Sequence, residues 1–400
     1  MKILILSDDY LPDGTRAHSK MLHDLALEFK GLGEKVTVLT LGNSSQSDLL
    51  ETSYLDGIEV WRFRSGKLRG VAKARRLINE LLIPYNAWKA TRSKLKDSSF
   101  DLCVNYSPTI FYGPYAKKLK QQGSFVYLVL RDFFPQWAID QGIISRRSPI
   151  AIFLRYFEEL NYRTSDCIGL QSPANLNLFK ARFPNLKSRV LMNWTSLNED
   201  PENVPSSVLQ KKYQLEGKVI FFYGGNIGQA QDMKNLMRLA RNMTSHPKAH
   251  FLFVGQGDEF ELINKIKRNQ CLDNVTILNS VSQEAFLDFL AMSDVGLFSL
   301  SKKHTAFNFP GKLLGYMKKS LPILGSVNSG NDLRNLIETH KAGMIFENGQ
   351  DELLYKASIK LLENETLRRD LGKNSNSLLS KEFSVESAAL KILEEFKLSR

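Results

Sequence analysis

The chain has 400 residues, 43% of them hydrophobic, and a formal net charge of +12. That length is too great for one typical hydrophobic core and favours two domains. It contains no apolar run of about 18 residues, so we expect no membrane-spanning helix. The three cysteines, Cys103, Cys167 and Cys271, lack paired spacing, which argues against a disulfide framework.

Short apolar runs alternate with helical patterns through the first half of the chain. The runs expected to be strands are 3–6, 36–41, 102–104, 125–130 and 167–170. This alternation predicts an α/β domain over residues 1–195 with a doubly wound parallel sheet. A strand that begins at residue 2 leaves no room for a signal peptide, so we expect a cytoplasmic protein.

A loop with a glycine follows the first predicted strand. Gly14, Thr15 and Arg16 lie there, just before a helical pattern. Ligands of doubly wound folds bind at the carboxyl ends of strands. We therefore predict that Gly14 and Thr15 contact a ligand. The alternative is that Gly14 only serves a turn.

Basic residues are concentrated between residues 67 and 96, where Glu80 is the only acidic residue. Residues 1–195 carry +10 of the net charge, and residues 196–400 carry +2. Apolar residues interleave the basic ones, and such a segment suits an anionic membrane surface. The residues predicted to face that membrane are Arg69, Arg75, Arg76 and Trp88. The alternative is a core-packed helix with a solvated basic face. No nucleic-acid motif is present, so no nucleic-acid partner is expected.

A carboxylate follows the predicted strand 125–130. Asp132 would stand at the carboxyl edge of the sheet, where it could orient a sugar hydroxyl or assist proton transfer. The alternative is an ion pair with Arg131 or a turn cap.

A polar stretch, Asn193–Tyr213, has weak periodicity and is predicted to link the domains. The strand and helix pattern then resumes over residues 196–380. The runs expected to be strands are 219–223, 251–254, 275–278, 295–299 and 322–324. A last helix within 381–400 is expected to pack back across the linker. Two Rossmann-like halves would face each other across a cleft, which is a common place for a ligand.

Glycines follow the first strand of the second half. Gly224, Gly225 and Gly228 lie between a strand and a helix, where backbone N–H groups can bind phosphate. The segment is not a P-loop, because no Gly-Lys-Ser/Thr follows. The nearby Gly255-Gln-Gly257 has Phe260 where a dinucleotide fingerprint needs its third glycine.

The segment from Phe307 to Ser326 is predicted to contain a helix start and then a buried strand. Asn308 would cap the helix, and Pro310 suits its first turn. The N–H groups of Gly311-Lys312-Leu313 would then face an anion, and Lys312 would add a full charge. The functional interpretation is a phosphate-bearing ligand. The alternative is an ordinary helix with a solvated lysine.

Metal and nucleophile patterns are weak. His246 and His250 are four residues apart, but Pro247 breaks the helical geometry that a metal pair would need. We expect no metal and no cofactor.

These segments together resemble glycosyltransferase family 4, whose members have the GT-B fold of two facing Rossmann-like domains. The resemblance runs over essentially the whole chain. It is carried by the loop 12–14, the turn 131–135, the segments 223–228 and 253–257, and the segment 308–322. The sequence of residues 308–317, NFPGKLLGYM, is most similar to a bacterial surface-polysaccharide subgroup that includes L-fucosamine transferases.

The resemblance implies transfer of a sugar from a UDP-sugar, the donor substrate, to a polyprenyl-diphosphate-linked glycan. The enzyme would be a hexosyltransferase-type glycosyltransferase, peripherally attached to the inner face of the cell membrane. Gly224–Gly228 and Gly311–Leu313 would hold the diphosphate, while Gly255 and Val281 would lie near the nucleobase. Asp132 falls at the family's active-site turn. Lys312 and backbone N–H groups would stabilise the leaving diphosphate without a metal.

Two departures from the family pattern affect the predicted donor site. Members usually carry two glutamates around the helix start, where this chain has Phe307 and Gly315. Many also place Arg and Lys where this chain has the neutral Asn226 and Gln231. Lys312 is left as the chief cationic candidate. A catalytically silent UDP-sugar-binding protein and a UDP-sugar 2-epimerase are the alternative functions.

Overall fold

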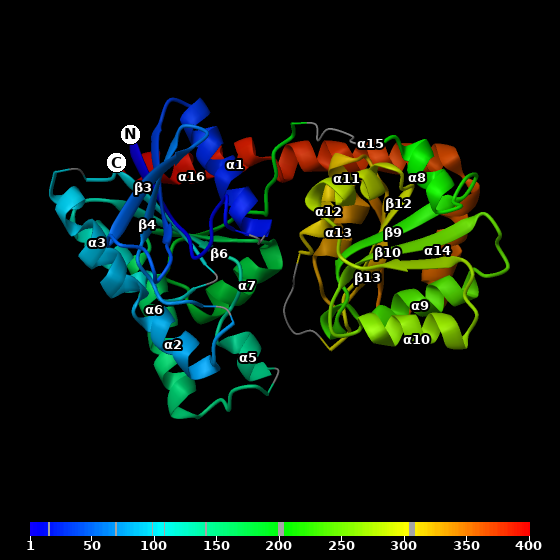
Figure 1. Ribbon diagram of the computed structural model, residues 1–400, viewed down its shortest axis with the longest axis horizontal. Coiled ribbons are helices and arrows are strands. Elements are labelled where there is room, and N and C mark those ends of the chain that lie inside the picture. The colour runs from blue at the N-terminus through cyan, green and yellow to red at the C-terminus, as the bar shows by residue number, and fades with distance from the viewer. Residues whose placement is uncertain are drawn as a thin grey trace. The chain divides into compact units, whose positions relative to one another are not determined.

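The computed structural model describes residues 1–14, 17–68, 70–97, 99–107, 109–140, 142–198, 204–303 and 309–400. Within them the chain divides into two compact units (Figure 1). The first unit contains residues 1–196 together with 385–400, and the second contains residues 197–384. Several residues singled out above, Thr15, Arg16, Arg69, Phe307 and Asn308, lie outside the described residues.

The first unit is built on an eight-stranded sheet with the order β3-β4-β2-β1-β5-β6-β7-β8. Its strands are β1 (Lys2–Leu6), β2 (Lys35–Leu41), β3 (Leu50–Leu55), β4 (Ile58–Phe63), β5 (Leu102–Tyr106), β6 (Phe125–Leu130), β7 (Cys167–Leu170) and β8 (Ser188–Val190). All neighbours pair in parallel except β3 and β4, which are antiparallel. The central strands β5 and β6 are buried along their whole length, which explains the unbroken apolar sequence of β6. In β5 the buried Asn105 side chain donates to Asn161 Oδ1 at 2.8 Å.

Helices complete the first unit. They are α1 (Ala17–Gly31), α2 (Lys73–Leu81), α3 (Ile83–Asp97), α4 (Gly113–Gln121), α5 (Gln136–Asp140), α6 (Pro149–Thr164), α7 (Pro173–Arg182) and α16 (Val385–Lys397). Figure 1 shows the last of these, α16, beside α1, and the two helices are in contact. Ala389 and Ile392 of α16 are fully buried in the core that also holds Leu22 and Leu25 of α1.

The second unit has a six-stranded parallel sheet with the order β11-β10-β9-β12-β13-β14. The strands are β9 (Val219–Asn226), β10 (Ala249–Gln256), β11 (Val275–Leu278), β12 (Val295–Ser299), β13 (Ile323–Val327) and β14 (Gly343–Glu347). The helices are α8 (Ser206–Lys212), a 3₁₀ turn η1 (Gln229–Gln231), α9 (Met233–Asn242), α10 (Phe260–Asn269), α11 (Gln283–Ala291), α12 (Lys312–Lys318), α13 (Leu333–Thr339), α14 (Asp351–Glu363) and α15 (Glu365–Glu382). The α/β prediction with parallel sheets is thus confirmed.

The segment predicted as a linker is ordered at both of its described ends. Trp194 is fully buried in the core of the first unit, and its Nε1–H donates to the Met21 carbonyl at 2.7 Å. At the other end, residues 206–212 form α8, which packs on α11 in the second unit. The boundary between the two units, after residue 196, falls inside this stretch, and its weak periodicity reflects short elements that bury only one or two side chains each. No helix among the described ranges is long and apolar enough to cross a membrane.

Candidate functional site

The carboxyl ends of β9 and β10 in the second unit approach each other unusually closely. Gly225 and Gly255 are paired across the two strands. A Cβ atom on Gly255 would lie 1.8 Å from the Gly225 carbonyl oxygen, and Gly225 has a φ of 113°. Both positions therefore require glycine for the backbone itself. This requirement is independent of any contact with a nucleobase, and that contact stays a prediction.

The glycines predicted to bind an anion are mostly strand residues. Strand β9 continues to Asn226, so Gly224 and Gly225 belong to it and only Gly228 lies in the following loop. The Gly224 N–H donates to the Tyr316 hydroxyl at 3.2 Å, and that hydroxyl donates to the Leu297 carbonyl at 2.9 Å. The Gly224 N–H is therefore occupied, which corrects the expectation that it is available to a ligand.

The loop after β9 is held by side chains rather than left open. Asn226 Nδ2 donates to Gln231 Oε1 at 2.7 Å, and the Gln229 N–H donates to Asp258 Oδ1 at 3.2 Å. A Cβ atom on Gly228 would lie 2.6 Å from the same carboxylate oxygen. No pattern in the sequence indicates that Asp258 lies here. Because this carboxylate borders the loop, an anion is better accommodated on the side of Lys312.

Lys312, the first residue of α12, reaches back to this sheet edge. Its Nζ lies 3.3 Å from the centroid of the Tyr223 ring and 3.8 Å from where a Cβ on Gly225 would be. The Nζ atom is buried, and it has no hydrogen-bond partner among the residues that the structure describes. The ring face offers the ammonium a cation–π contact but no hydrogen-bond acceptor.

Burial lowers the pKa of Lys312 well below its usual value, and no charge among the described residues opposes that shift. An ammonium group without water or a counter-charge is destabilised relative to the neutral amine. An anion that entered this space would restore the missing interaction. The arrangement is therefore suited to binding a negatively charged group and to stabilising charge that develops on it.

The start of α12 differs in part from the prediction. Gly311 is the exposed N-cap, and Pro310 precedes it. The Leu313 N–H donates to the Pro310 carbonyl at 3.1 Å, so this group, expected to be free, is not available. The N–H groups of Gly311 and Lys312 form no hydrogen bond within the described part of the chain.

Two further positions bear on nucleotide recognition. A Cβ atom on Gly315 would lie 3.2 Å from Leu290 Cδ2, so a glutamate at this position would have to displace that side chain. This chain has no carboxylate at this position, so a ribose would have to be recognised by other groups. Val281 follows β11 and is 38% exposed, which leaves its predicted contact with a nucleobase sterically open.

In the first unit, Asp132 follows β6 as predicted. Its neighbour Arg131 is buried, donates to the carbonyls of Leu191 and Met192, and stacks on Trp194 at 4.9 Å. Desolvation by the surrounding protein raises the pKa of the Asp132 carboxyl, although the residue itself is exposed, and the charges of Arg131 and His18 oppose this rise. A carboxylate with a raised pKa is a better proton acceptor near neutral pH than an ordinary aspartate.

Sequence reasoning missed the group that faces Asp132 from α1. His18 Nε2 lies 3.2 Å from Asp8 Oδ1, and its ring lies 5.2 Å from the ring of Tyr106. Asp8 follows β1 and His18 begins α1, so these two are close in sequence. Tyr106, the last residue of β5, and Asp132 lie about a hundred residues farther along the chain. The only available signal was that Asp8 and Asp132 each directly follow a predicted central strand.

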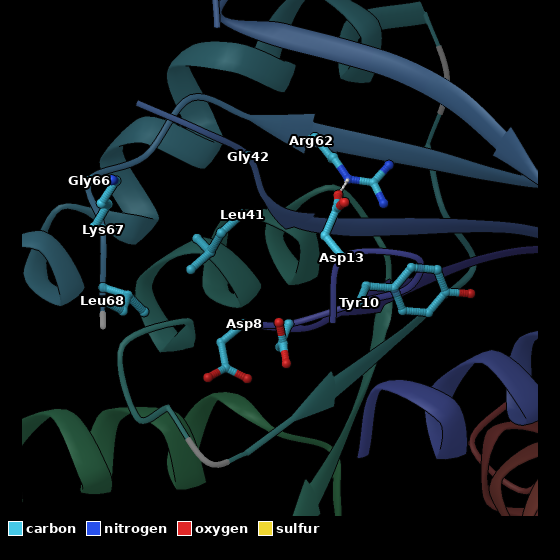
Figure 2. A pocket seen from close by; sticks show the side chains of 10 residues that line it. Asp8, Tyr10, Asp13, Leu41, Gly42, Arg62, Gly66, Lys67 and Leu68 are labelled. Carbon is cyan, nitrogen blue, oxygen red and sulfur yellow. Dashed lines mark ion pairs between the residues drawn. The ribbon is translucent and has the colours of Figure 1, made fainter. Parts of the chain in front are cut away.

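Asp8 also lines a cavity of about 310 Å³ at the carboxyl ends of β1, β2 and β4 (Figure 2). Figure 2 shows Asp13 beside Arg62, whose Nε lies 3.7 Å from Asp13 Oδ2. The wall is formed by Asp8, Asp9, Tyr10, Asp13, Leu41, Gly42, Arg62, Gly66, Lys67 and Leu68. Carboxylates and a guanidinium around a small cavity suit a ligand with several hydroxyl groups.

Gly14 lies near this cavity but does not line it. Its N–H donates to the Tyr10 carbonyl at 2.8 Å, and a Cβ atom there would lie 2.6 Å from Ser19 Oγ. The structure thus gives Gly14 the turn role that was its alternative interpretation. Its contact with a donor stays a prediction.

The predicted membrane-facing residues separate into two groups. Arg75 and Arg76 of α2 are exposed, and Arg76 pairs with Glu80 at 2.9 Å. Trp88 instead packs on the core of the first unit, edge to face with Tyr115 at 6.4 Å. Trp88 is thus partly buried against α4, and its contact with a membrane stays a prediction. Where side chains are described, no group of three or more His, Cys, Asp or Glu could hold a metal ion.

Comparison with known proteins was made on sequence and on structure. Residues 207–377 match the family described as Glycosyl transferases group 1. Over 219 residues the chain is 24% identical to "Probable glycosyltransferase WbjE" of Pseudomonas aeruginosa, and the alignment covers 53% of each protein. The chain thus spans about half the length of that curated relative.

Solved structures match over the full chain. The structure of Anabaena Alr3699/HepE in complex with UDP gives a TM-score of 0.69 at 16% identity and covers 100% of both chains. WaaG, a glycosyltransferase involved in lipopolysaccharide biosynthesis, gives a TM-score of 0.64 at 14% identity and covers 98% of this chain and 99% of its own. These likenesses identify the fold as GT-B, and the predicted fold class is confirmed.

Proposed function

We propose that this chain, whose residues 207–377 carry a Glycosyl transferases group 1 domain, transfers a sugar from a UDP-linked donor to a lipid-linked glycan. The family match supports glycosyl transfer as the class of reaction. The donor and the acceptor are inferred from the two sites described above, and the sugar from the resemblance of the segment 308–317.

The observation that carries the proposal is the buried ammonium group of Lys312. It lies over the Tyr223 ring beside Gly225, and the described residues offer it no acceptor and no counter-charge. A nucleoside diphosphate would supply both. When the donor reacts, the departing diphosphate gains negative charge, and a fixed cation at that point stabilises the transition state more than the ground state. The UDP complex of the similar Anabaena structure supports uracil as the base.

The acceptor side is proposed to be the first unit. An acceptor hydroxyl oxygen bonds to the anomeric carbon, the bond from that carbon to the diphosphate breaks, and UDP leaves with the electron pair. The hydroxyl proton passes to a carboxylate or to the leaving phosphate. Asp132 is the proposed carboxylate, because its raised pKa suits proton acceptance. The nearby cavity with Arg62 and three aspartates would hold the acceptor sugar.

We further propose surface-polysaccharide assembly at the inner membrane face as the setting. The similarity to WaaG supports this setting. N-acetyl-L-fucosamine is the proposed sugar, from the resemblance of the segment 308–317 alone. Transfer is proposed to need no metal, because the Lys312 ammonium group would supply positive charge beside the diphosphate.

The test is UDP binding and sugar transfer by paired variants in the two units. Lys312→Ala should lower UDP affinity and reduce transfer by at least tenfold, because it removes the cation beside the diphosphate. Asp132→Asn should reduce transfer while UDP affinity changes less than twofold, because it removes only a proton acceptor. Thermal shift with UDP, GDP and ADP, with and without EDTA, measures binding.

Lys302→Ala, which removes an exposed cation from the same unit, is the matched control and should match wild type. UDP binding that survives Lys312→Ala would contradict the donor site. Stabilisation that EDTA abolishes would contradict metal independence.

One observation favours a second candidate, a UDP-sugar-binding protein without turnover. Gly315 stands where a ribose-binding glutamate is usual in the resembled family, and a Cβ atom there would lie 3.2 Å from Leu290 Cδ2. This candidate predicts UDP stabilisation in the thermal shift with no transfer to any lipid-linked glycan. The main proposal predicts both stabilisation by UDP and transfer to a lipid-linked glycan.

A further inference from the structure

The start of α6 has an outward face that is apolar. Ala151 and Leu154 point inward and are buried, whereas Ile152, Phe153 and Tyr156 are 63%, 40% and 63% exposed. An amphipathic surface helix normally presents polar side chains on this face. Ile143, in the preceding loop, is also 63% exposed. Contiguous exposed apolar side chains of this kind mark an interaction surface.

Helix α2 adjoins the same region. Its Leu77 and Leu81 pack with Phe111, Leu154 and Phe157 in one apolar cluster. Beyond that cluster, Ile78 of α2 and Tyr85 of α3 are 56% and 62% exposed. Figure 1 shows α2, α5 and the start of α6 grouped at one end of the first unit. We call the exposed apolar residues on either side of the cluster the α2–α6 patch: Ile78, Tyr85, Ile143, Ile152, Phe153 and Tyr156.

Cations border the α2–α6 patch. Arg75, Arg146 and Arg147 are exposed and form no ion pair with any residue that the structure describes. The sequence from 142 to 157 contains three arginines and no acidic residue. The nearest carboxylate in α2, Glu80, is paired with Arg76. The apolar side chains of the patch are therefore bordered by positive charges.

We propose that the α2–α6 patch docks on the surface of an anionic lipid bilayer, with its apolar side chains in the headgroup region and its arginines on the lipid phosphates. A bilayer interface accepts aliphatic and aromatic side chains together with cations, and each basic residue near an anionic surface contributes to attachment. A nucleic acid would attract the arginines but would leave the exposed isoleucines in water.

This inference deepens the proposed function, because it names the surface that would bring the protein to a lipid-linked acceptor. It does not depend on catalysis. Binding is measured on vesicles that contain neither donor nor glycan, so failure of the proposed transfer would leave the result unchanged.

The test is co-sedimentation with vesicles of phosphatidylcholine alone or mixed with phosphatidylglycerol. Wild type should bind the mixed vesicles at low salt at least tenfold more strongly than the neutral ones. Arg146→Glu with Arg147→Glu should lower that binding at least tenfold. Ile143→Ser with Ile152→Ser should lower it at least fivefold and should retain wild-type thermal unfolding, because both side chains are mostly exposed.

Matched controls lie in the second unit. Lys302→Glu with Lys303→Glu makes the same charge change at exposed positions there, and Leu353→Ser removes an exposed leucine. Both should bind vesicles within twofold of wild type.

Four outcomes would overturn the proposal. They are equal losses in the Arg146/Arg147 and Lys302/Lys303 variants, no binding of wild type to anionic vesicles, tighter binding to a single-stranded RNA than to the vesicles, and vesicle-free dimerisation that Ile143→Ser with Ile152→Ser abolishes.

Discussion

A lysine whose ammonium group is buried without an acceptor either loses its proton or gains an anion. The sequence placed Lys312 correctly near a helix start, because proline and glycine mark that boundary. It could not show that the Nζ lies over Tyr223, 89 positions earlier, nor that Tyr316 occupies the Gly224 N–H. Those contacts depend on how α12 packs against β9, which no local pattern encodes.

Stability should therefore depend on pH through Lys312. Its folded pKa is lowered, so between that value and the unfolded pKa of about 10.4 the unfolded state binds more protons. The contribution of Lys312 to the free energy of unfolding is then least favourable at low pH and improves as pH rises through this window. Urea unfolding of wild type and Lys312→Met at pH 7 and pH 9.5 measures the change.

We expect the stability advantage of Lys312→Met over wild type to shrink at the higher pH. A difference that stays constant with pH would show that the folded-state pKa of Lys312 is not lowered. Saturating UDP at pH 7 should shrink the same advantage, because the bound anion stabilises the charged form only in wild type.

At the scale of elements, buried parallel strands were predictable and peripheral ones were not. Strands β6 and β7 begin and end where the apolar runs do. Strand β3 was missed because most of its side chains are exposed at an antiparallel edge, so its sequence LETSYL has no apolar run. The bounds of helix α6 were not predicted, because its outward face is apolar, which obscures the helical period. The same feature makes α6 part of the α2–α6 patch.

The close approach of β9 and β10 predicts unequal effects of two glycine substitutions. Gly255→Ala places a Cβ atom 1.8 Å from a backbone carbonyl oxygen, which cannot move aside. We expect it to lower the free energy of unfolding by about 3 kcal/mol, as severe overpacking does. Gly311→Ala meets no atom within 4 Å at a φ of −58°, so it should be neutral or stabilise by up to about 1 kcal/mol.

Urea unfolding at fixed pH compares the two variants. Equal effects would mean that the strand edge relaxes to admit the methyl group and that Gly255 is not required by the backbone.

At the scale of the whole molecule, the chain is two α/β units, and the first is completed by the last helix. The sequence indicated two domains because the strand and helix pattern pauses and then resumes. It also suggested that the C-terminal helix returns, but not that Ala389 and Ile392 would be core residues of the first unit. That assignment depends on which apolar groove is left open beside α1, a property of the assembled sheet.

Deleting residues 385–400 should therefore destabilise the first unit selectively. Calorimetry should show the transition of the first unit at a lower temperature, because Ala388, Ala389, Ile392 and Phe396 no longer fill its core. The transition of the second unit, identified by its shift with UDP, should change little. An equal shift of both transitions would show that α16 stabilises the units jointly.

The packing of α16 on the first unit also affects the order in which the two units can fold during synthesis. A ribosome makes residues 1–196 first, but the groove beside α1 stays unfilled until residues 385–400 emerge, after the whole second unit has been translated. At about 5–20 residues per second this delay is roughly 10–40 s. During that time the unit that was synthesised first is incomplete and exposes apolar surface to chaperones, whereas the unit synthesised second can close first. A fusion partner or tag placed directly after residue 400 would thus act on the folding of the N-terminal half.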